Sequence, residues 1–510
     1  MAPERFQNTA LPQKFRRHLQ AQDWHKWDRY ARRVRTLDLD DRRPTARRKV
    51  ENSVFDEIAR TRPREELLPN LHTIGWWTSS ADQQARSILF MHSNIKSLSL
   101  RFHNSPTHPL ATYVQAIVER VPHVTRLEVR ADTAMHDLQT EMLSLMSRLH
   151  QLKELVVPMY FITSLAMSEL ALLPALESVE FAHPIEGGTG DRADVVEFNP
   201  ALLDDAFPAL KRLSFSSHLQ HAVNFLNHPA SPRNLVSIYL QVLAIDNPPI
   251  LQHYFISVAH HLGRLTELYI DFLLGPDSPI VTPPPPPIAR PCLETFRPLM
   301  SCRCLRRLEL RWDYQLYIRE SDLEELAMSW PFLELLLLNC DPIPEPEPPM
   351  LSPLALVFFA KHCLRLRELA LYIDGCRVPT ADLELVPPFV RLEKLSLGSS
   401  PIADEDAMAL FLSQLCPIKC EVIAGVRWPD AYGIALDNAG VDEHIRSDMG
   451  EWWMKWTNVG KVLPLAIKAR RHEKDRMSAV MSEVDRRNKD RLEELENELR
   501  ELRGKMELGP

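Results

Sequence analysis

The sequence predicts an α/β solenoid in which short parallel strands line a concave face and helices cover the convex face. Three observations lead to this prediction. A short apolar pattern returns along almost the whole chain, helix-like segments lie between its copies, and the composition (45% hydrophobic, 25% charged) is that of folded protein. Since 510 residues exceed what one compact core usually supports, a repeat array is expected.

The repeat has the form x-L-x-x-L-x-L, with aliphatic or aromatic variants. Its spacing is irregular, mostly about 24–34 residues, which is typical of the longer leucine-rich repeats. Thirteen copies and a degenerate fourteenth are VRTLDL (34–39), NLHTIGW (70–76), NIKSLSL (94–100), HVTRLEV (123–129), QLKELVV (151–157), ALESVEF (175–181), ALKRLSF (209–215), NLVSIYL (234–240), RLTELYI (264–270), CLRRLEL (304–310), FLELLLL (332–338), RLRELAL (365–371), RLEKLSL (391–397) and IKCEVI (418–423).

Each copy predicts one short strand with its leucines on one face. Leu98 and Leu100 are two residues apart, and side chains alternate along a strand, so both point the same way. One repeat cannot bury that face alone, but stacked parallel strands make a continuous core. An ordinary doubly wound α/β protein also alternates strands and helices, but its strands would not all carry the same L-x-x-L-x-L motif.

Helices are expected between the strands, because apolar residues recur there three or four positions apart. The segment with Tyr113, Ile117 and Val121 shows this spacing. A second example is Leu138, Met142, Leu145 and Leu149.

Two proline-rich insertions interrupt the array. Residues 276–291 include PPPPP at Pro283–Pro287, and residues 341–353 read DPIPEPEPPMLSP. Both are expected to be extended and exposed. They are interpreted as stiff spacers, with docking on SH3- or WW-type domains as the alternative.

The repeat stops after about residue 424. Trp452, Trp453 and Trp456 then cluster on an expected helix, where they either seal the last strand or form a binding patch. Beyond Pro464 the chain is charged and helical, with Leu492, Leu495, Leu499, Leu502 and Met506 at coiled-coil spacing. This seam suits a solvated single helix as well as a weak homodimer through 488–506.

The expected organisation has four parts. Residues 1–33 form an N-terminal helical cap, 34–424 the repeats, 425–464 a capping segment and 465–510 a charged helix with a short coiled coil.

Charge and cysteine usage restrict the class of protein. The net charge is −8, although residues 1–64 carry 17 Lys and Arg against 9 Asp and Glu. Because the rest of the chain is acidic, nucleic acid is not an expected partner. The eight cysteines form no CxxC pair and are expected to be reduced thiols. With no signal-peptide pattern and no membrane-spanning run, a cytoplasmic or nuclear location is expected.

Motifs for catalysis or cofactor binding were sought along the chain. Residues 188–193 match G-x-G-x-x-A, but they do not follow directly on a strand, so a loop is predicted there. The sequence has no Walker loop, G-x-S-x-G elbow or HExxH helix. No catalytic residue, metal site or cofactor is predicted, and the chain is not expected to be an enzyme.

Two segments resemble the fungal F-box/leucine-rich-repeat proteins. The first carries Asp23, Trp24, Tyr30, Ala31, Val34, Arg35 and Leu37, with Trp27 where that family usually has Phe. The second carries Leu67, Leu68, Pro69, Asn70, Leu71 and Trp76. In that family an F-box of about forty residues upstream binds the adaptor of a ubiquitin ligase. No F-box is recognised in these 510 residues, so the resemblance implies an adaptor partner only if one lies upstream.

Partner binding is expected on the concave face of the later repeats. The residue between the last two leucines of each copy, and the positions flanking those leucines, face outward. In the early copies these positions are small or charged, but later copies supply exposed aromatic and aliphatic side chains with a charged rim, the composition of an interface core. The predicted partner-binding residues are Tyr239, Tyr269, Arg307, Glu309, Arg311, Leu335, Leu337 and Tyr372. The alternative is that the proline-rich insertion or the C-terminal helix covers this patch.

The sequence thus predicts a protein–protein interaction module, a substrate-recognition or adaptor protein related to F-box/leucine-rich-repeat ligase subunits. The alternative is a scaffold that self-associates through its C-terminal coiled coil and has no role in ubiquitination.

Overall fold

In a computed structural model of the chain, the described residues form fourteen strands, each overlapping one copy of the repeat. The structure describes residues 14–41, 50–103, 109–131, 133–182, 187–245, 247–272, 280, 283–379, 386–427 and 429–507. The chain divides into two compact units, Met1–Leu316 and Tyr317–Pro510.

The first unit holds ten parallel strands that pair in sequence order. They are β1 (Thr36–Asp40), β2 (Thr73–Trp77), β3 (Ser97–Phe102), β4 (Arg126–Ala131), β5 (Glu154–Val157), β6 (Ser178–Phe181), β7 (Arg212–Ser217), β8 (Ser237–Val242), β9 (Glu267–Asp271) and β10 (Arg307–Arg311).

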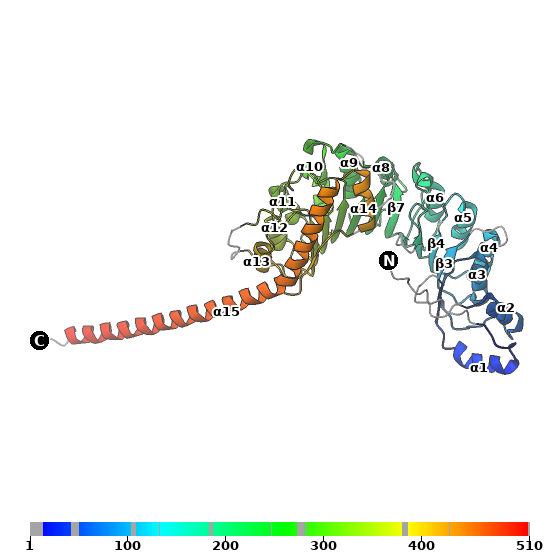
Figure 1. The fold of residues 1–510 in the computed structure, drawn as a ribbon, viewed down its shortest axis with the longest axis horizontal. Helices are drawn as coiled ribbons and strands as arrows, with labels where there is room; N and C mark the ends of the chain where they lie inside the picture. Colours follow the sequence, from blue (N-terminus) through cyan, green and yellow to red (C-terminus); the bar gives the residue numbers. More distant parts are fainter. Residues whose placement is uncertain are drawn as a thin grey trace, which may run out of the picture. The chain divides into compact units, whose positions relative to one another are not determined.

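Helices and 3-10 turns connect these strands (Figure 1). They are α1 (Ala21–Ala31), α2 (Asn52–Thr61), α3 (Ala81–Arg86), η1 (Ser87–Phe90), α4 (Leu110–Arg120), α5 (Gln139–Arg148), α6 (Ser164–Ala171), η2 (Arg192–Val195), α8 (Leu219–Asn227), α9 (Pro248–His261), η3 (Pro287–Ala289), α10 (Leu293–Phe296) and η4 (Arg297–Ser301).

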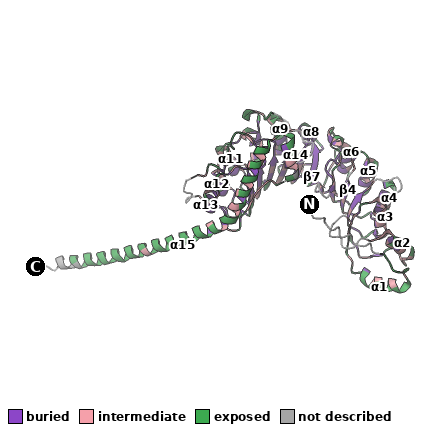
Figure 2. Cartoon of the chain, in the orientation of Figure 1, coloured by how far each residue is buried: buried purple, intermediate pink, exposed green. Residues whose placement is uncertain are grey.

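The leucines of the repeat form ladders across the strands, as predicted. Leu98 of β3 is in register with Leu127 of β4, which is in register with Leu155 of β5, and all three are fully buried. The helical positions expected to be apolar, such as Ile117 and Met142, are buried as well. Strands and helices therefore share one layered core (Figure 2).

The start of most strands repeats one backbone motif. Two successive amides of one copy donate to a single carbonyl of the preceding copy, as Lys153 N and Glu154 N do to Thr125 O. Lys211 N and Arg212 N bond to Glu177 O in the same way. The motif fixes the register between neighbouring copies, so the leucines stay aligned.

The second unit holds four parallel strands, also paired in sequence order within the unit. They are β11 (Leu335–Leu338), β12 (Glu368–Leu371), β13 (Lys394–Ser396) and β14 (Glu421–Ile423). Its helices are α11 (Glu320–Ser329), α12 (Ala355–His362), α13 (Glu405–Leu415), α14 (Pro429–Asn438) and α15 (Glu443–Glu507). All fourteen predicted strands are thus confirmed, and the fold is that of leucine-rich repeats.

Helix α15 closes the second unit. Its first half packs against α13 and β14, and Trp456, Val459, Leu463 and Ile467 are buried. Trp456 Nε1 donates to the carbonyl of Ser400 at 2.9 Å. Trp456 therefore seals the last repeat, the first of the two interpretations of the tryptophan cluster. The helix continues through Pro464 without a break at the expected boundary.

One expectation about the insertions is wrong. Residues 341–344 are buried, not exposed, because Tyr432 of α14 donates to Pro342 O at 2.7 Å and Ser399 Oγ donates to the same carbonyl at 3.4 Å. Pro346, Glu347 and Pro348 are exposed as expected. In the other insertion, 276–279 and 281–282 lie outside the described residues, while Ile288 is exposed.

Candidate partner-binding face

The open face of the sheet in the first unit is formed by the residues between and beside the buried leucines. On β6, β8 and β9 it carries Phe181, Tyr239 and Tyr269, here called the aromatic row. Tyr239 and Tyr269 are register partners with ring centroids 6.3 Å apart, and Phe181 meets Tyr239 edge-on at 5.9 Å. All three side chains are half-buried.

Phe181 was not among the predicted residues, because the repeat pattern assigns it to the core. It is in register with the buried Val157, yet it packs against the Met159, Tyr160, Val195 and Leu243 cluster and against Tyr239. The register between β6 and β7 pairs only Ser178 with Arg212 and Val179 with Leu213, so Phe181 has no register partner on β7. β7 lies between β6 and β8, and its residue in register with Tyr239 is the small Ser214. A side chain of this size leaves room for Phe181 and Tyr239 to meet across β7.

The two tyrosines remain neutral at physiological pH. Burial raises the pKa of Tyr239 well above its ordinary value, and the nearby carboxylate of Asp271 adds to this shift. Burial also raises the pKa of Tyr269. The Tyr239 hydroxyl donates to Asp271 Oδ2 at 3.4 Å. The row therefore offers aromatic surface together with phenol groups, a combination enriched at protein interfaces.

Charged residues of β9 and β10 flank the row. Arg307 is exposed and lies 3.5 Å from Glu267, and Glu309 is half-buried in register with Tyr269. Arg311 was expected on an exposed rim, and that expectation is wrong. Its side chain is buried, and its Nη1 donates to Asp271 Oδ2 at 3.0 Å. Arg311 thus holds Asp271, which in turn accepts from Tyr239.

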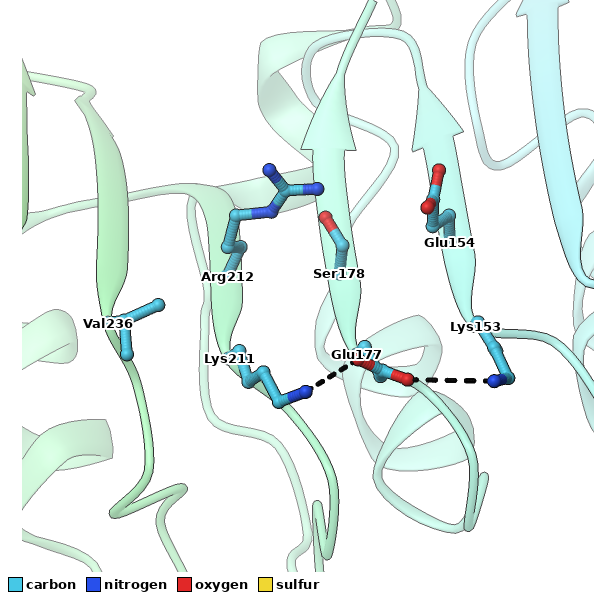
Figure 3. Close-up of a pocket in the computed structure, with 7 residues that line it drawn as sticks. All are labelled: Lys153, Glu154, Glu177, Ser178, Lys211, Arg212 and Val236. Carbon is cyan, nitrogen blue, oxygen red and sulfur yellow. Dashed lines mark hydrogen bonds and ion pairs between the residues drawn. The ribbon is translucent and has the colours of Figure 1, made fainter.

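A second group of charges crosses the amino ends of β5–β7. Lys211 Nζ lies 2.6 Å from Glu177 and Lys153 Nζ lies 3.8 Å from the same carboxylate, whose pKa is lowered mainly by its hydrogen bond from Lys211 (Figure 3). Arg212 pairs with Glu180 at 3.0 Å, and Arg126 of β4 pairs with Glu154 of β5. A hollow of about 210 Å³ here is lined by Lys153, Glu154, Glu177, Ser178, Lys211, Arg212 and Val236. Cations and anions alternate here, so this part of the face has no strong charge of one sign.

The loop after β6 limits the face at the carboxyl ends of the strands. Gly190 N donates to Met159 O at 2.8 Å, Arg192 donates to the carbonyl of Leu243, and Asp194 accepts from His136 Nδ1 at 2.8 Å. The pair with Asp194 raises the pKa of His136. Residues 188–193 thus form the predicted loop, which ends in the short 3-10 turn η2.

The last outward residues of β7 and β8, Ser216 and Gln241, are buried. The accessible part of the face therefore lies toward the middle and the amino ends of the strands.

The predicted residues of the second unit have a different environment. Leu337 was expected to be exposed, and that expectation is wrong, because it is only 2% exposed and packs with Cys340, Ala370 and the half-buried Leu335. Tyr372 is half-buried, and burial raises its pKa.

The chain from Arg427 to Leu436 returns to this face. Arg427 Nη1 donates to Glu368 at 2.7 Å, its backbone N donates to Asp341 at 3.2 Å, and Tyr432 donates to Pro342 O. The segment that makes these bonds follows the repeats, and it is neither the proline-rich insertion nor the charged C-terminal helix that the alternative interpretation named.

The described residues contain no cluster of three or more His, Cys, Asp or Glu side chains placed to hold a metal ion. Within the same residues, no helix is both long and apolar enough to cross a membrane. The cysteines described in the structure are free thiols, of which Cys340, Cys363, Cys416 and Cys420 are buried.

Comparisons with known proteins add the following. No protein-family model matches the sequence, and no curated protein matches it. Among solved structures, the chain is similar to the leucine-rich repeat-containing protein LegL7 from Legionella pneumophila, at 13% identity and a TM-score of 0.34, with 59% of this chain and 89% of that chain covered.

It is also similar to a chain in the complex of Rad7 and Elc1 in yeast, at 16% identity and a TM-score of 0.36, covering 72% of this chain and 76% of that chain. A chain of the TLR13–ssRNA13 complex gives 11% identity and a TM-score of 0.29, covering 77% and 61%.

Proposed function

We propose that the chain is a non-enzymatic protein-binding module whose partner docks on the open face of the first unit around the aromatic row. The observation that carries this proposal is the half-buried row of Phe181, Tyr239 and Tyr269 beside paired charges. Aromatic side chains on rigid strands lose little conformational entropy on binding, and a polar rim supplies specificity.

The chemistry of the face defines the kind of partner. An aliphatic or aromatic side chain can pack on the rings of Tyr239 and Tyr269. A backbone carbonyl or carboxylate can accept from the hydroxyl of Tyr269, whereas the hydroxyl of Tyr239 already donates to Asp271. Nucleic acid is a poorer candidate, because Lys153, Lys211 and Arg212 already pair with carboxylates of the neighbouring strand.

We further propose that this binding serves substrate recognition or an adaptor role in ubiquitin ligation. Support comes from the two segments that resemble F-box/leucine-rich-repeat proteins. In this chain they interlock: Trp27 Nε1 donates to Leu67 O at 3.0 Å, and Asn70 Nδ2 donates to Arg32 O at 2.7 Å. The pair thus ties α1 to the second copy of the repeat.

The partner face is tested with the full-length chain and the variant Tyr239→Ala/Tyr269→Ala. Proteins captured by each are quantified by mass spectrometry, and circular dichroism checks the fold. Two central aromatic residues are worth about 2 kcal/mol or more at such a face, so roughly thirty-fold weaker capture of the specific partners is expected.

The matched control is Leu165→Ala/Leu172→Ala, which truncates two exposed side chains of the same unit outside the open face. It should retain the partners. Unchanged capture by the tyrosine variant, with the fold intact, would reject this site. The role in ubiquitin ligation is tested separately by measuring whether the captured partners are ubiquitinated less when the gene is deleted.

A further inference from the structure

The second half of α15 carries an unpaired apolar stripe. After Ile467 the described side chains of the helix are exposed or half-buried (Figure 2). Exposed apolar residues continue along it: Met477, Met481, Val484, Leu492, Leu495, Leu499 and Leu502. An isolated helix with this many exposed aliphatic side chains is expected to bury them against a partner.

The stripe has the spacing of a coiled-coil seam longer than the leucine segment alone. Met481, Asn488, Leu492 and Leu499 take position a of the heptad, and Met477, Val484, Leu495 and Leu502 take position d. A four-residue step between Asn488 and Leu492 is a stutter, which such coils accommodate by local unwinding. From Met477 to Leu502 the seam is about 39 Å long. The side chain of Met506, the last member expected from the sequence, lies outside the described residues.

The charges beside the seam select the partner and its direction. Arg491 and Glu498 take position g, and Glu496 and Arg503 take position e. In a parallel dimer each g residue meets the e residue five positions later in the other helix. Two identical helices in register therefore bring Arg491 to Glu496 and Glu498 to Arg503.

An antiparallel pair of the same helices is disfavoured. With Leu492 opposite Leu502 and Leu495 opposite Leu499, position e faces e and g faces g. Glu496 of one helix would then face Glu496 of the other, and Glu498 would face Glu498. Both contacts bring like charges together and are repulsive. The ion pairs within the helix, such as Arg491 with Glu494 and Arg500 with Glu496, are exposed and weak, so they do not prevent exchange between helices.

We propose that a second copy of this chain occupies the seam as a parallel, in-register two-stranded coiled coil over residues 477–502. Asn488 at position a favours two strands in one register, because two asparagine side chains can bond to each other across the seam. The dimer joins two partner-binding faces in one assembly, and such linkage strengthens binding to a multivalent target. The inference rests on α15 alone and holds whether or not the proposed partner face is correct.

The first test measures the mass of the full-length chain by sedimentation equilibrium over about a hundred-fold range of concentration. The mass is expected to rise from 58.7 kDa toward twice that value. The variant Glu496→Arg/Glu498→Arg places four like charges beside the seam and should stay monomeric. So should Arg491→Glu/Arg503→Glu, while an equimolar mixture of the two variants should dimerise again.

The matched control is Glu493→Arg/Glu494→Arg, which makes the same charge change at positions b and c, away from the seam. It should dimerise like the natural chain. A chain that is monomeric throughout or forms trimers would overturn the proposal, and so would charge variants that dimerise as well as the natural chain.

The second test fixes the direction of the helices. Asn488→Cys should form a disulfide-linked dimer on mild oxidation, because parallel helices in register place the two residues 488 side by side. Asn497→Cys, at position f on the outer side of the same helix, should not exceed the background of the natural chain. A dimer in which Asn488→Cys fails to cross-link above that background is not parallel and in register.

Discussion

Trp456 is the side chain on which the end of the second unit depends. It is fully buried, and its Nε1 bonds to Ser400 O. A Cβ at position 375 would stand 3.3 Å from its ring and 2.7 Å from the carbonyl oxygen of Pro401, so glycine is the residue that fits there without a shift. Trp456→Ala should lower the free energy of unfolding by about 3–5 kcal/mol, as expected for a large aromatic side chain in a core. Urea denaturation measures the loss. Met454→Ala on the same helix, 62% exposed, should change it by under about 0.5 kcal/mol, and an equal effect of both variants would contradict this role.

Arg311 and Asp271 form a buried ion pair in the first unit. Arg311→Met should lower the free energy of unfolding by about 3–5 kcal/mol, because it leaves the Asp271 carboxylate buried without its cation. Arg311→Met/Asp271→Leu removes both charges and should be more stable than the single variant. Chemical denaturation of the three proteins decides between these outcomes, and a double variant less stable than Arg311→Met would exclude the explanation.

Glu57 of α2 holds the segment before α1. Its carboxylate accepts from Arg60 at 2.6 Å and from Leu19 N at 2.8 Å, and these bonds lower its pKa to about 2. A lowered carboxylate pKa contributes stability that is fully present above its unfolded value of about 4.5 and is lost as the pH falls toward 2. NMR titration of the Glu57 carboxyl carbon should show this pKa. In Arg60→Gln it should rise toward 4.5, and an unchanged value would contradict the assigned cause.

Single residues also show what the sequence could not supply. The burial of Leu98 could be predicted from the pattern, since the neighbouring strands carry a leucine at the same position, such as Leu127 and Leu155. Leu337 has the same kind of local context as an open-face residue, but its side chain packs with Cys340 and with Ala370 of the next copy. Phe181 is likewise misassigned by its pattern, because its side chain packs against the cluster of Met159, Tyr160, Val195 and Leu243 and against Tyr239. Both errors come from tertiary contacts that no local spacing encodes.

At the scale of elements, α15 divides into a packed half and a free half. The division falls after Ile467, three residues beyond Pro464, where the sequence suggested a boundary. The composition of the sequence changes near this point, but the sequence did not indicate that one helix spans the change. Leu463 and Ile467 bury on the same side of α15, and this packing carries the helix past a proline that weakens it locally.

Deleting residues 468–510 should leave the free energy of unfolding within about 0.5 kcal/mol of the full chain, because the described side chains in this range are exposed or half-buried. Deleting 454–510 removes Trp456, Val459, Leu463 and Ile467 as well, and should destabilise the second unit by several kcal/mol. Thermal and urea denaturation of both truncated chains test this. Similar losses in the two would show that the distal helix also stabilises the repeats.

At the scale of the whole molecule, the described residues owe their stability to apolar ladders and backbone bonds between copies. The fourteen strands could be located from the sequence alone, because the same alternation of apolar residues recurs in each copy of the repeat. The partner face was located less well. Tyr239 and Tyr269 lie together as expected, whereas Arg311 and Leu337 are buried.

Chelation of metal ions or addition of a reducing agent should have little effect on the melting temperature. Since no metal cluster is found among the described residues and the described cysteines are free thiols, EDTA and a reducing agent should each leave the melting temperature unchanged within about 1 °C. Differential scanning calorimetry measures it. A fall of several degrees in EDTA would reveal a metal that contributes to stability.

The alternating ion pairs of β4–β7 have a consequence for how fast this protein meets other molecules. Arg126, Lys153, Lys211 and Arg212 each lie beside a glutamate of a neighbouring strand, so the field above them largely cancels within a few ångströms. If a partner docks here as proposed, its association is expected to proceed with little electrostatic steering, at about 10⁵–10⁶ M⁻¹s⁻¹, and to depend little on ionic strength. Under the proposed function, the lifetime of the complex, set by how well the partner covers the rings of Tyr239 and Tyr269, is then expected to decide which partners stay bound.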